Sequence, residues 1–336
     1  MIITKTPFRM SFFGGGTDME EYFKKNKGAV LSTTFDKYCY VNVRHLPRFF
    51  EYSTELSYSK TERVTGVDSI QHPAIRNAMK MLDMHEIRLT YEADLPARSG
   101  LGTSSSFAVG MLNAFYALKG KYADKGRLAN EAIYLERILC GEAGGWQDQI
   151  AASYGGFNRI NFGPDGYEVL PIIIAPERKK QLNDNLMMFF TGFTRFSSEI
   201  QQENSKGNNE DKNIRLKQMY ELVDEAEQIL VNKNRNLDDF GELLDLTWRL
   251  KRGTGNAVTT DSLDGVYEKG MKAGALGGKL LGAGGGGFFV FYVQPDRQEE
   301  VKNAMKDLMY IPFKFEDGGT RVIHYSPEIY EPREKE

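Results

Sequence analysis

The most informative stretch of this 336-residue chain is Pro96-Ala97-Arg98-Ser99-Gly100-Leu101-Gly102-Thr103-Ser104-Ser105-Ser106. It lies between a predicted strand over 87–93 and an apolar run that predicts a helix over 103–119. Glycines that open a helix leave unpaired backbone N–H groups at the positive end of the helix dipole, where phosphate binds favourably. Hydroxyl side chains in the first helical turn add hydrogen bonds or a metal ligand. The stretch therefore predicts a phosphate loop that handles a nucleotide triphosphate.

Length and composition bound the class of protein. A chain that is 41% hydrophobic and 26% charged is globular, with one large domain or two smaller ones. A net charge of −3 argues against a general nucleic-acid or anionic-membrane surface. No signal peptide or membrane-spanning run is recognised. Two cysteines, Cys39 and Cys140, are too few for a disulfide framework, so a reducing cytoplasm is expected.

Helical and strand patterns are intermixed without regular alternation, which predicts an α+β protein. Pro176 and a polar run interrupt the pattern near 175–185, so we expect domains over 1–180 and 181–336. Thr17 or Asp18 is expected to cap a short helix over 19–25. Further strands are predicted over 2–13, 28–46, 49–58, 156–174, 186–191, 288–293 and 321–325, and further helices over 73–83, 125–140, 146–153, 197–205, 213–232, 236–252, 263–274 and 296–308.

Three common nucleotide-binding signatures do not fit. A P-loop requires a lysine after its second glycine, whereas Gly102 is followed by Thr103 and Ser104. The Gly282–Gly287 run matches a dinucleotide-binding fingerprint in spacing, but it precedes a strand instead of opening a helix. The His-Arg-Asp and Asp-Phe-Gly signatures of protein kinases are absent.

The phosphate-loop stretch resembles the central motif of the GHMP kinases, a family named for galactose, homoserine, mevalonate and phosphomevalonate kinases. That motif reads Pro-x-x-x-Gly-Leu-Gly-Ser-Ser-Ala, and this chain keeps it in register from Pro96. Thr103 replaces the usual Ser and Ser105 the usual Ala. Both changes are small, and Ser104 remains at the metal-ligand position.

Two further segments resemble the first and third motifs of this family. Thr6–Asp18 carries a basic residue, Arg9, in a strand and an aspartate nine residues later. Gly277–Gly287 is similar to the glycine loop that packs beside the nucleotide phosphates. The resemblance implies a two-domain α+β fold, with an N-terminal domain like ribosomal protein S5 domain 2 and a ferredoxin-like C-terminal domain. ATP and a sugar would bind in the cleft between them.

The resemblance also implies roles for individual residues. Asp148 is expected to accept or orient the proton of the sugar hydroxyl, with Arg9 beside it. Ser104 and Glu136 are expected to hold Mg²⁺, and Lys279 either contacts phosphates or covers apolar surface. The remaining contacts are expected with the sugar through Gly16, Thr17 and Asp18, and with ATP through Gly100, Leu101, Gly102, Thr103, Ser104, Ser105, Gly284, Gly285 and Gly286.

Within the family the chain is most similar to D-glycero-D-manno-heptose 7-phosphate kinases, over Phe8–Asp18, Phe190–Glu199, Trp248–Arg252 and Gly277–Gly287. Those enzymes phosphorylate the anomeric oxygen to give the 1,7-bisphosphate, a precursor of nucleotide-activated heptose for surface glycans. Galactokinases carry Gly-Glu-His-Thr-Asp where this chain has three glycines before Thr-Asp, which argues against galactose. A fucokinase-like activity is the alternative.

A sugar that already carries a 7-phosphate needs a second anion site. Arginine suits bidentate phosphate binding, so Arg195 is a candidate, and Arg98, Lys251 and Arg252 are others. A catalytically silent sugar and ATP sensor is the competing class of function. The intact catalytic and metal-binding set favours an enzyme, while the oligomeric state stays open.

Overall fold

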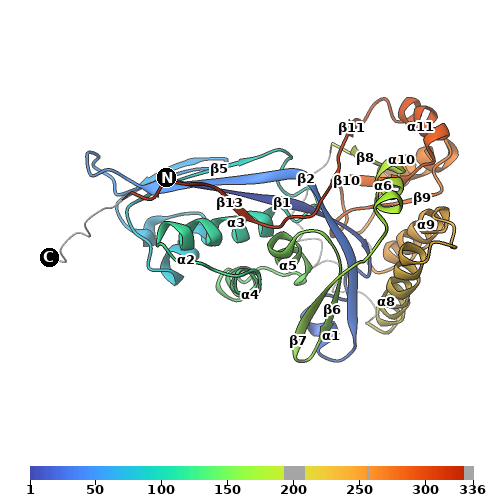
Figure 1. Cartoon of the computed structure of the whole chain (residues 1–336), viewed down its shortest axis with the longest axis horizontal. Helices are drawn as coiled ribbons and strands as arrows, with labels where there is room; N and C mark the ends of the chain where they lie inside the picture. The colour runs from blue at the N-terminus through green and yellow to red at the C-terminus, as the bar shows by residue number, and fades with distance from the viewer. Residues whose placement is uncertain (193–208, 256, 329–336) are drawn as a thin grey trace.

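The structure, a computed structural model, describes residues 1–192, 209–255 and 257–328. Within these residues the chain forms a nine-stranded sheet and a separate four-stranded sheet, both flanked by helices. Figure 1 shows an elongated molecule, with the large sheet at one end and the smaller sheet at the other. The α+β class predicted from the sequence is confirmed.

The large sheet is built on two long strands, β1 (Ile2–Phe13) and β2 (Gly28–His45). They pair antiparallel from Ile2 opposite Val43 to Phe13 opposite Leu31. One end of β2 pairs with β5 and the other with β6, so β2 holds two parts of the sheet together. Five further strands from the first part of the chain belong to this sheet: β3 (Thr54–Ser57), β4 (Thr61–Val64), β5 (Ile87–Ala93), β6 (Phe157–Gly163) and β7 (Gly166–Pro171). Its remaining two strands come from the end of the chain.

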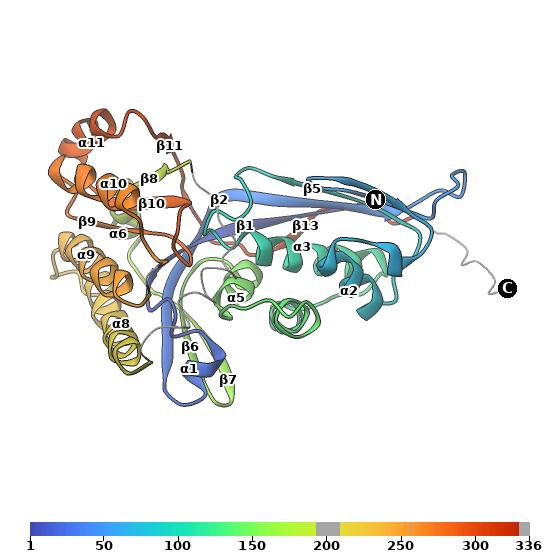
Figure 2. The same ribbon diagram turned by 180° about the vertical axis from the view of Figure 1, so that it is seen from behind.

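One face of this sheet is covered by helices, as the two opposite views of Figures 1 and 2 show. The central helix, α3 (Thr103–Leu118), is apolar on nearly every side because it is enclosed by the sheet and its neighbours. This packing on nearly every side holds the N-terminus of α3 in place against the large sheet. The helices around it are α2 (Pro73–Met81), α4 (Lys125–Ile133) and α5 (Gln147–Tyr154).

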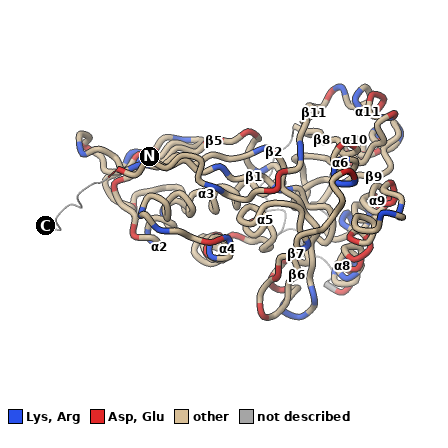
Figure 3. The backbone as a smooth tube through the Cα atoms, viewed as in Figure 1, with Lys and Arg blue, Asp and Glu red and all other residues tan. Residues whose placement is uncertain are grey.

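The smaller sheet is antiparallel, in the order β11 (Met309–Ile311), β8 (Leu186–Phe190), β10 (Phe288–Tyr292) and β9 (Gly277–Leu280). Charges of both signs are interspersed along two neighbouring helices, α8 (Asn209–Val231) and α9 (Asp238–Arg252) (Figure 3). Further helices that accompany this sheet are α6 (Pro176–Asp184), α10 (Asp261–Lys272) and α11 (Gln298–Ala304).

An aromatic core joins the two sheets. The ring of Phe240 on α9 lies 5.3 Å from that of Phe12 and 5.0 Å from that of Phe13, both in edge-to-face geometry. The chain then returns to the large sheet, where β12 (Phe315–Glu316) pairs with β2 and β13 (Arg321–Tyr325) pairs with β1. The domain boundary expected at residue 180 stays a prediction. The last two strands, β12 and β13, belong to the large sheet.

Several local predictions need correction. The strand expected over 49–58 is limited to β3, and the one over 156–174 is a hairpin of β6 and β7. The helix expected over 125–140 leaves α geometry after Ile133 and continues as a π-helical turn over Tyr134–Leu139. This wider turn is typical of functional sites. The helix expected over 197–205 lies outside the described residues.

The predicted cap of the first helix is also wrong. The helix α1 (Glu20–Phe23) begins after Met19, and no side chain caps it. The hydroxyl of Thr17 instead contacts the carbonyl groups of Gly14 and Ala29. The carboxylate of Asp18 turns back toward the catalytic region described below.

Candidate active site

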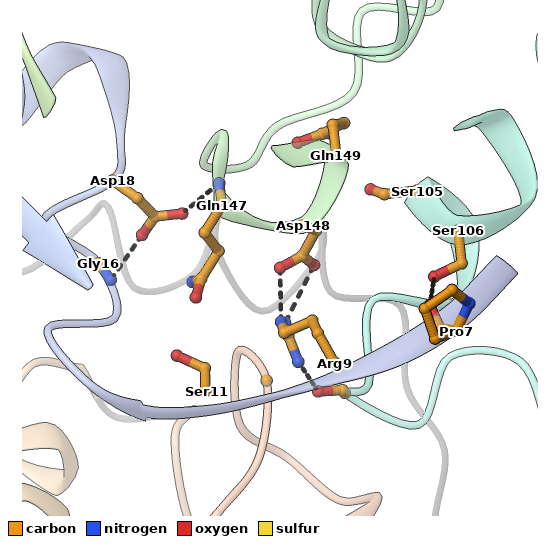
Figure 4. Close-up of polar contacts among 12 residues, drawn as sticks. Pro7, Arg9, Ser11, Gly16, Asp18, Ser105, Ser106, Gln147, Asp148 and Gln149 are labelled. Atoms are coloured by element: carbon orange, nitrogen blue, oxygen red, sulfur yellow. Dashed lines mark hydrogen bonds and ion pairs between the residues drawn. The ribbon is translucent and has the colours of Figure 1, made fainter. Parts of the chain in front are cut away.

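Arg9 and Asp148, the predicted catalytic pair, are in direct contact. The guanidinium donates from Nε to Oδ1 at 2.7 Å and from Nη2 to Oδ2 at 3.0 Å, which is a bidentate ion pair (Figure 4). Its third donor, Nη1, binds the carbonyl oxygen of Gly100 at 2.6 Å. Arg9 is only 4% exposed, whereas the Asp148 side chain is 25% exposed. The carboxylate therefore faces solvent on one side and a fixed cation on the other.

The phosphate-loop candidate lies directly against this pair. Gly102 has a φ of +71° and precedes α3, whose N-terminus has no side-chain cap. A Cβ on Gly102 would lie 3.2 Å from Cγ of Arg9 and 3.4 Å from the Asp148 carboxyl group. Glycine thus allows both the left-handed turn and the close approach. The uncapped start of α3 therefore lies next to the Asp148 carboxyl group, and N–H groups at a helix N-terminus favour phosphate binding.

The third-motif loop packs against the phosphate loop through backbone atoms. Gly282 has a φ of +79°, and a Cβ placed there would be 2.3 Å from Cα of Gly100. Further along, a Cβ on Gly287 would be 2.1 Å from the carbonyl oxygen of Ser99. Gly285 donates its N–H to the carbonyl of Val258 at 3.0 Å. The loop from Gly282 to Gly287 therefore closes one side of the phosphate loop.

Glu136 is the buried acidic group of the site, at 1% exposure on the π-helical turn. Its Oε1 accepts the hydroxyl of Ser104 at 2.8 Å. Its Oε2 accepts the hydroxyl of Ser105 at 2.7 Å and the amide of Gln149 at 2.5 Å. These donors fix the carboxylate beside the start of α3, and Ser104 is exposed at the mouth of the loop. Ser105, expected mainly to support the helical turn, also contacts this acid.

Asp18 lies on the other side of the catalytic pair. Its carboxylate accepts the N–H of Gly16 at 2.9 Å and that of Gln147 at 3.3 Å. Burial raises the pKa of Asp18, and the nearby negative charge of Asp148 raises it further. A buried carboxyl next to a second one suits hydrogen bonding to sugar hydroxyls. The nearby Thr17, predicted to bind sugar, is instead fully buried and bonded to backbone groups of the turn.

Two lysines approach the site, one from helix α9 and one from strand β9 of the smaller sheet. Lys251, at the end of α9, donates to the carbonyl groups of Leu280 and Gly282, and burial lowers its pKa to about 8. Lys279 is 2% exposed and donates to the carbonyls of Ser11 and Phe12 at 2.8 Å each. Burial lowers its pKa well below the usual value. Lys279 therefore joins β9 to β1. From the sequence, this lysine is expected either to contact phosphates or to cover apolar surface, and neither expectation includes this contact.

The structure gathers most of the predicted site residues around the start of α3. Arg195 lies outside the described residues, and Arg252 is paired with Asp264 at 2.9 Å. The sequence interpretation missed Gln149 and Gln147, which hold Glu136 and Asp18. The sequence feature that could have pointed to them is their position directly before and after Asp148.

Comparisons with known proteins show the family of this chain. The GHMP kinase N-terminal domain profile matches residues 70–156, and the GHMP kinase C-terminal profile matches residues 221–311. The D-glycero-alpha-D-manno-heptose 7-phosphate kinase of Campylobacter jejuni is 30% identical over 91% of this chain and 93% of its own length. A mevalonate kinase of Pyrococcus horikoshii is 26% identical over 89% of this chain and 82% of its own length. The chain belongs to the GHMP kinases.

Solved structures share the fold. A structure titled D-glycero-D-manno-heptose 1-phosphate kinase, from Bacteroides thetaiotaomicron, has a TM-score of 0.76 at 23% identity and covers 98% of this chain and 100% of its own. A putative sugar kinase from Campylobacter jejuni has a TM-score of 0.68 at 25% identity, over 96% and 97%.

The family and the relatives together define the class of enzyme. The protein is an ATP-dependent sugar kinase, a phosphotransferase that acts on an alcohol group. Among the residues that the structure describes, no helix combines the length and apolarity that a membrane crossing requires.

Proposed function

We propose that this kinase transfers the γ-phosphoryl group of ATP to the anomeric hydroxyl of D-glycero-D-manno-heptose 7-phosphate. The product would be the 1,7-bisphosphate, an intermediate toward nucleotide-activated heptose. The observation that carries the proposal is the bidentate Arg9–Asp148 pair against the helix N-terminus at Gly102. The 30% identity to a heptose 7-phosphate kinase supports the choice of sugar.

The geometry supports a simple division of labour in phosphoryl transfer. The exposed side of the Asp148 carboxylate accepts a hydrogen bond from the anomeric hydroxyl and orients its oxygen toward the γ-phosphorus, taking the proton as the new O–P bond forms. Arg9 holds that carboxylate in place and stabilises the negative charge that develops as ADP leaves. Asp18 binds other sugar hydroxyls, with Gly16 at the same turn. The phosphates contact backbone N–H groups at the start of α3 and the Gly284–Gly286 loop.

Mg²⁺ fits the acidic side of the phosphate loop. Mg²⁺ is usually bound by one or two carboxylates together with substrate phosphates and water, and dedicated protein cages are rare. Glu136 supplies one carboxylate, and Ser104 supplies a neighbouring hydroxyl that is already within 2.8 Å of it. Within the described residues no cluster of three or more His, Cys, Asp or Glu side chains is arranged for a metal, in keeping with such a shared site. The ion, when bound, would neutralise phosphate charge.

A sugar 7-phosphate requires a cation beside the sugar site. Lys251 is one candidate, because its charge interacts with both Arg9 and Asp18, and Arg98, exposed beside the phosphate loop, stays another. Arg195 stays a candidate from the sequence resemblance. Kinetics of Arg195→Ala and Lys251→Met with phosphorylated and unphosphorylated sugar identify the contact. A true contact lowers kcat/KM for the phosphorylated sugar more than for the other, and equal losses reject it.

The experiment for the proposed function is ADP release with a panel of heptose 7-phosphate, mannose 6-phosphate, fucose and galactose. We expect the highest kcat/KM with heptose 7-phosphate, and a kcat for Asp148→Asn that is lower by about 10²-fold to 10⁴-fold. Highest activity with fucose would favour the fucokinase alternative, which a 26% identical fucokinase region of an Arabidopsis thaliana bifunctional enzyme supports. Equal ADP release by the wild type and Asp148→Asn would reject the mechanism.

The sensor alternative predicts a different outcome: binding of ATP and sugar without ADP release. The complete set of contacting catalytic residues argues against it. The cytoplasm predicted from the sequence remains the proposed location, since both cysteines are free and the donor is ATP.

A further inference from the structure

Two polar side chains beside the catalytic pair have no role in the chemistry described above. The hydroxyl of Ser11 and the amide oxygen of Gln147 are buried and have no hydrogen-bond partner in the part of the chain that the structure describes. Ser11 as a whole is only 4% exposed. An unpaired buried polar atom costs about 1–3 kcal/mol, and native proteins pair nearly all of them. Two such atoms at one place indicate a ligand.

Both side chains converge on Gly15. A Cβ built on Gly15 would lie 3.8 Å from Oγ of Ser11 and 3.9 Å from Nε2 of Gln147. Figure 4 shows the two side chains extending toward each other, between Asp18 and the catalytic pair. The absence of a side chain at Gly15 leaves room between them.

The backbone holds Ser11 and Gln147 beside Arg9 and Asp148. Ser11 follows Arg9 by two positions on β1, so both side chains lie on the same face of the strand. Its backbone carbonyl is held by Lys279 at 2.8 Å. Gln147 immediately precedes Asp148 in the first turn of α5. Each polar group is therefore the neighbour of one member of the catalytic pair.

We propose that Ser11 and Gln147 form a neutral subsite for the sugar hydroxyl next to the one that accepts the phosphoryl group. This inference rests on the proposed function, in which the acceptor is the anomeric hydroxyl, so the hydroxyl bound here is the 2-hydroxyl. The serine hydroxyl donates or accepts, and the amide oxygen accepts, so one alcohol group pairs with both. The subsite selects sugars with this hydroxyl over deoxy sugars, because a deoxy sugar leaves both groups unpaired.

The test compares Ser11→Ala and Gln147→Leu with the wild type on an active sugar and its 2-deoxy analogue. Each variant is expected to raise KM for the sugar about 5-fold to 10-fold, the effect of one neutral hydrogen bond, and to leave KM for the 2-deoxy analogue unchanged. The Tm of the ligand-free variants should equal or exceed that of the wild type, because an unpaired buried group has been removed. Equal losses on both sugars, or unchanged KM values, would overturn the subsite.

Ser153→Ala is the matched control. Ser153 is a buried serine on α5 whose hydroxyl binds the carbonyl of Lys125, so this variant should lower Tm and leave KM unchanged. Calorimetric sugar binding separates the subsite from the proposed function. If the wild type binds sugar but releases no ADP, the proposed function fails. The subsite is then tested by comparing the Kd values of the wild type and the two variants for the sugar and for its 2-deoxy analogue. A wild type that binds no sugar overturns both.

Discussion

Two glycine loops meet at the centre of this enzyme, and they differ in what surrounds them. The loop at Gly100–Gly102 opens a buried helix and has Arg9, Asp148 and Glu136 within contact of it or of the first helical turn. The loop at Gly282–Gly287 joins two strands and carries no charged side chain of its own. In the proposed mechanism the first loop therefore brings together the catalytic and metal-binding groups, and the second determines the shape of the phosphate site.

The contact between the loops explains why both need glycine. Backbone lies on backbone where Gly100 meets Gly282, so neither position has room for a side chain. Behind the second loop, Lys251 holds the carbonyl groups of Leu280 and Gly282. This division predicts that changes around the first loop reduce kcat, and that changes in or behind the second reduce ATP affinity.

The largest expected effect is at the catalytic carboxylate. Asp148→Asn keeps the shape of the side chain but removes the base, so kcat should fall about 10²-fold to 10⁴-fold. KM for ATP should change little, because the phosphate-binding N–H groups are untouched. Steady-state ADP release at varied ATP measures both values. A variant that keeps wild-type kcat would remove Asp148 from the chemistry.

A smaller effect is expected at the acidic side of the first loop. Glu136→Gln keeps the volume and some hydrogen bonding but removes the negative charge, so the Mg²⁺ concentration for half-maximal activity should rise about 10-fold to 100-fold. Mg²⁺ titration of ADP release measures this shift, with Glu142→Gln as a control on the same segment. An unchanged Mg²⁺ dependence would contradict the role of Glu136.

The second loop is tested by adding one methyl group. Gly282→Ala places a Cβ at a positive φ and 2.3 Å from Gly100, so the loops must separate. We expect a loss of about 1–3 kcal/mol in unfolding free energy and a higher KM for ATP. Gly265→Ala is the control, because its Cβ would meet nothing within 4 Å and alanine favours a helix. Urea unfolding should show that only the first variant is destabilised.

The smallest effect is expected at Lys251, which binds the second loop from behind. Its pKa of about 8 means that the ammonium charge is lost as pH rises through that value, so kcat/KM for ATP should fall roughly 3-fold to 10-fold. Arg9, Asp18 and Lys279 are the charged groups that act on or respond to Lys251. Lys251→Arg should keep activity above pH 8, and Lys251→Met should remove this pH dependence.

Stability should change with pH in the opposite direction. The folded-state pKa of Lys251 lies below the usual lysine value, so the unfolded chain binds more protons between about pH 8 and that value. Unfolding free energy should therefore rise over this range while ATP use declines. Urea midpoints at pH 7.5 and 9.5 provide the measurement, and a wild type that loses stability over this interval would contradict the burial of Lys251.

The sequence predicts the motifs and most elements because each is local. Glycines before an apolar run identify the start of α3, and alternation of apolar residues identifies β1 and β2. The contacts of Lys279 with β1 and of Lys251 with the second loop join residues that are far apart in the chain, so no local pattern indicates them. The π-helical turn around Glu136 depends on tertiary packing, and so does the turn that holds Thr17.

The most direct test of the different roles of the two loops is one experiment, ADP release at limiting and saturating ATP for Asp148→Asn and Gly282→Ala in parallel. We expect Asp148→Asn to lose about 10²-fold to 10⁴-fold in rate at both ATP concentrations, whereas Gly282→Ala recovers most of its activity at saturating ATP. The reverse pattern, with Asp148→Asn rescued by ATP and Gly282→Ala inactive throughout, would contradict these roles of the two loops.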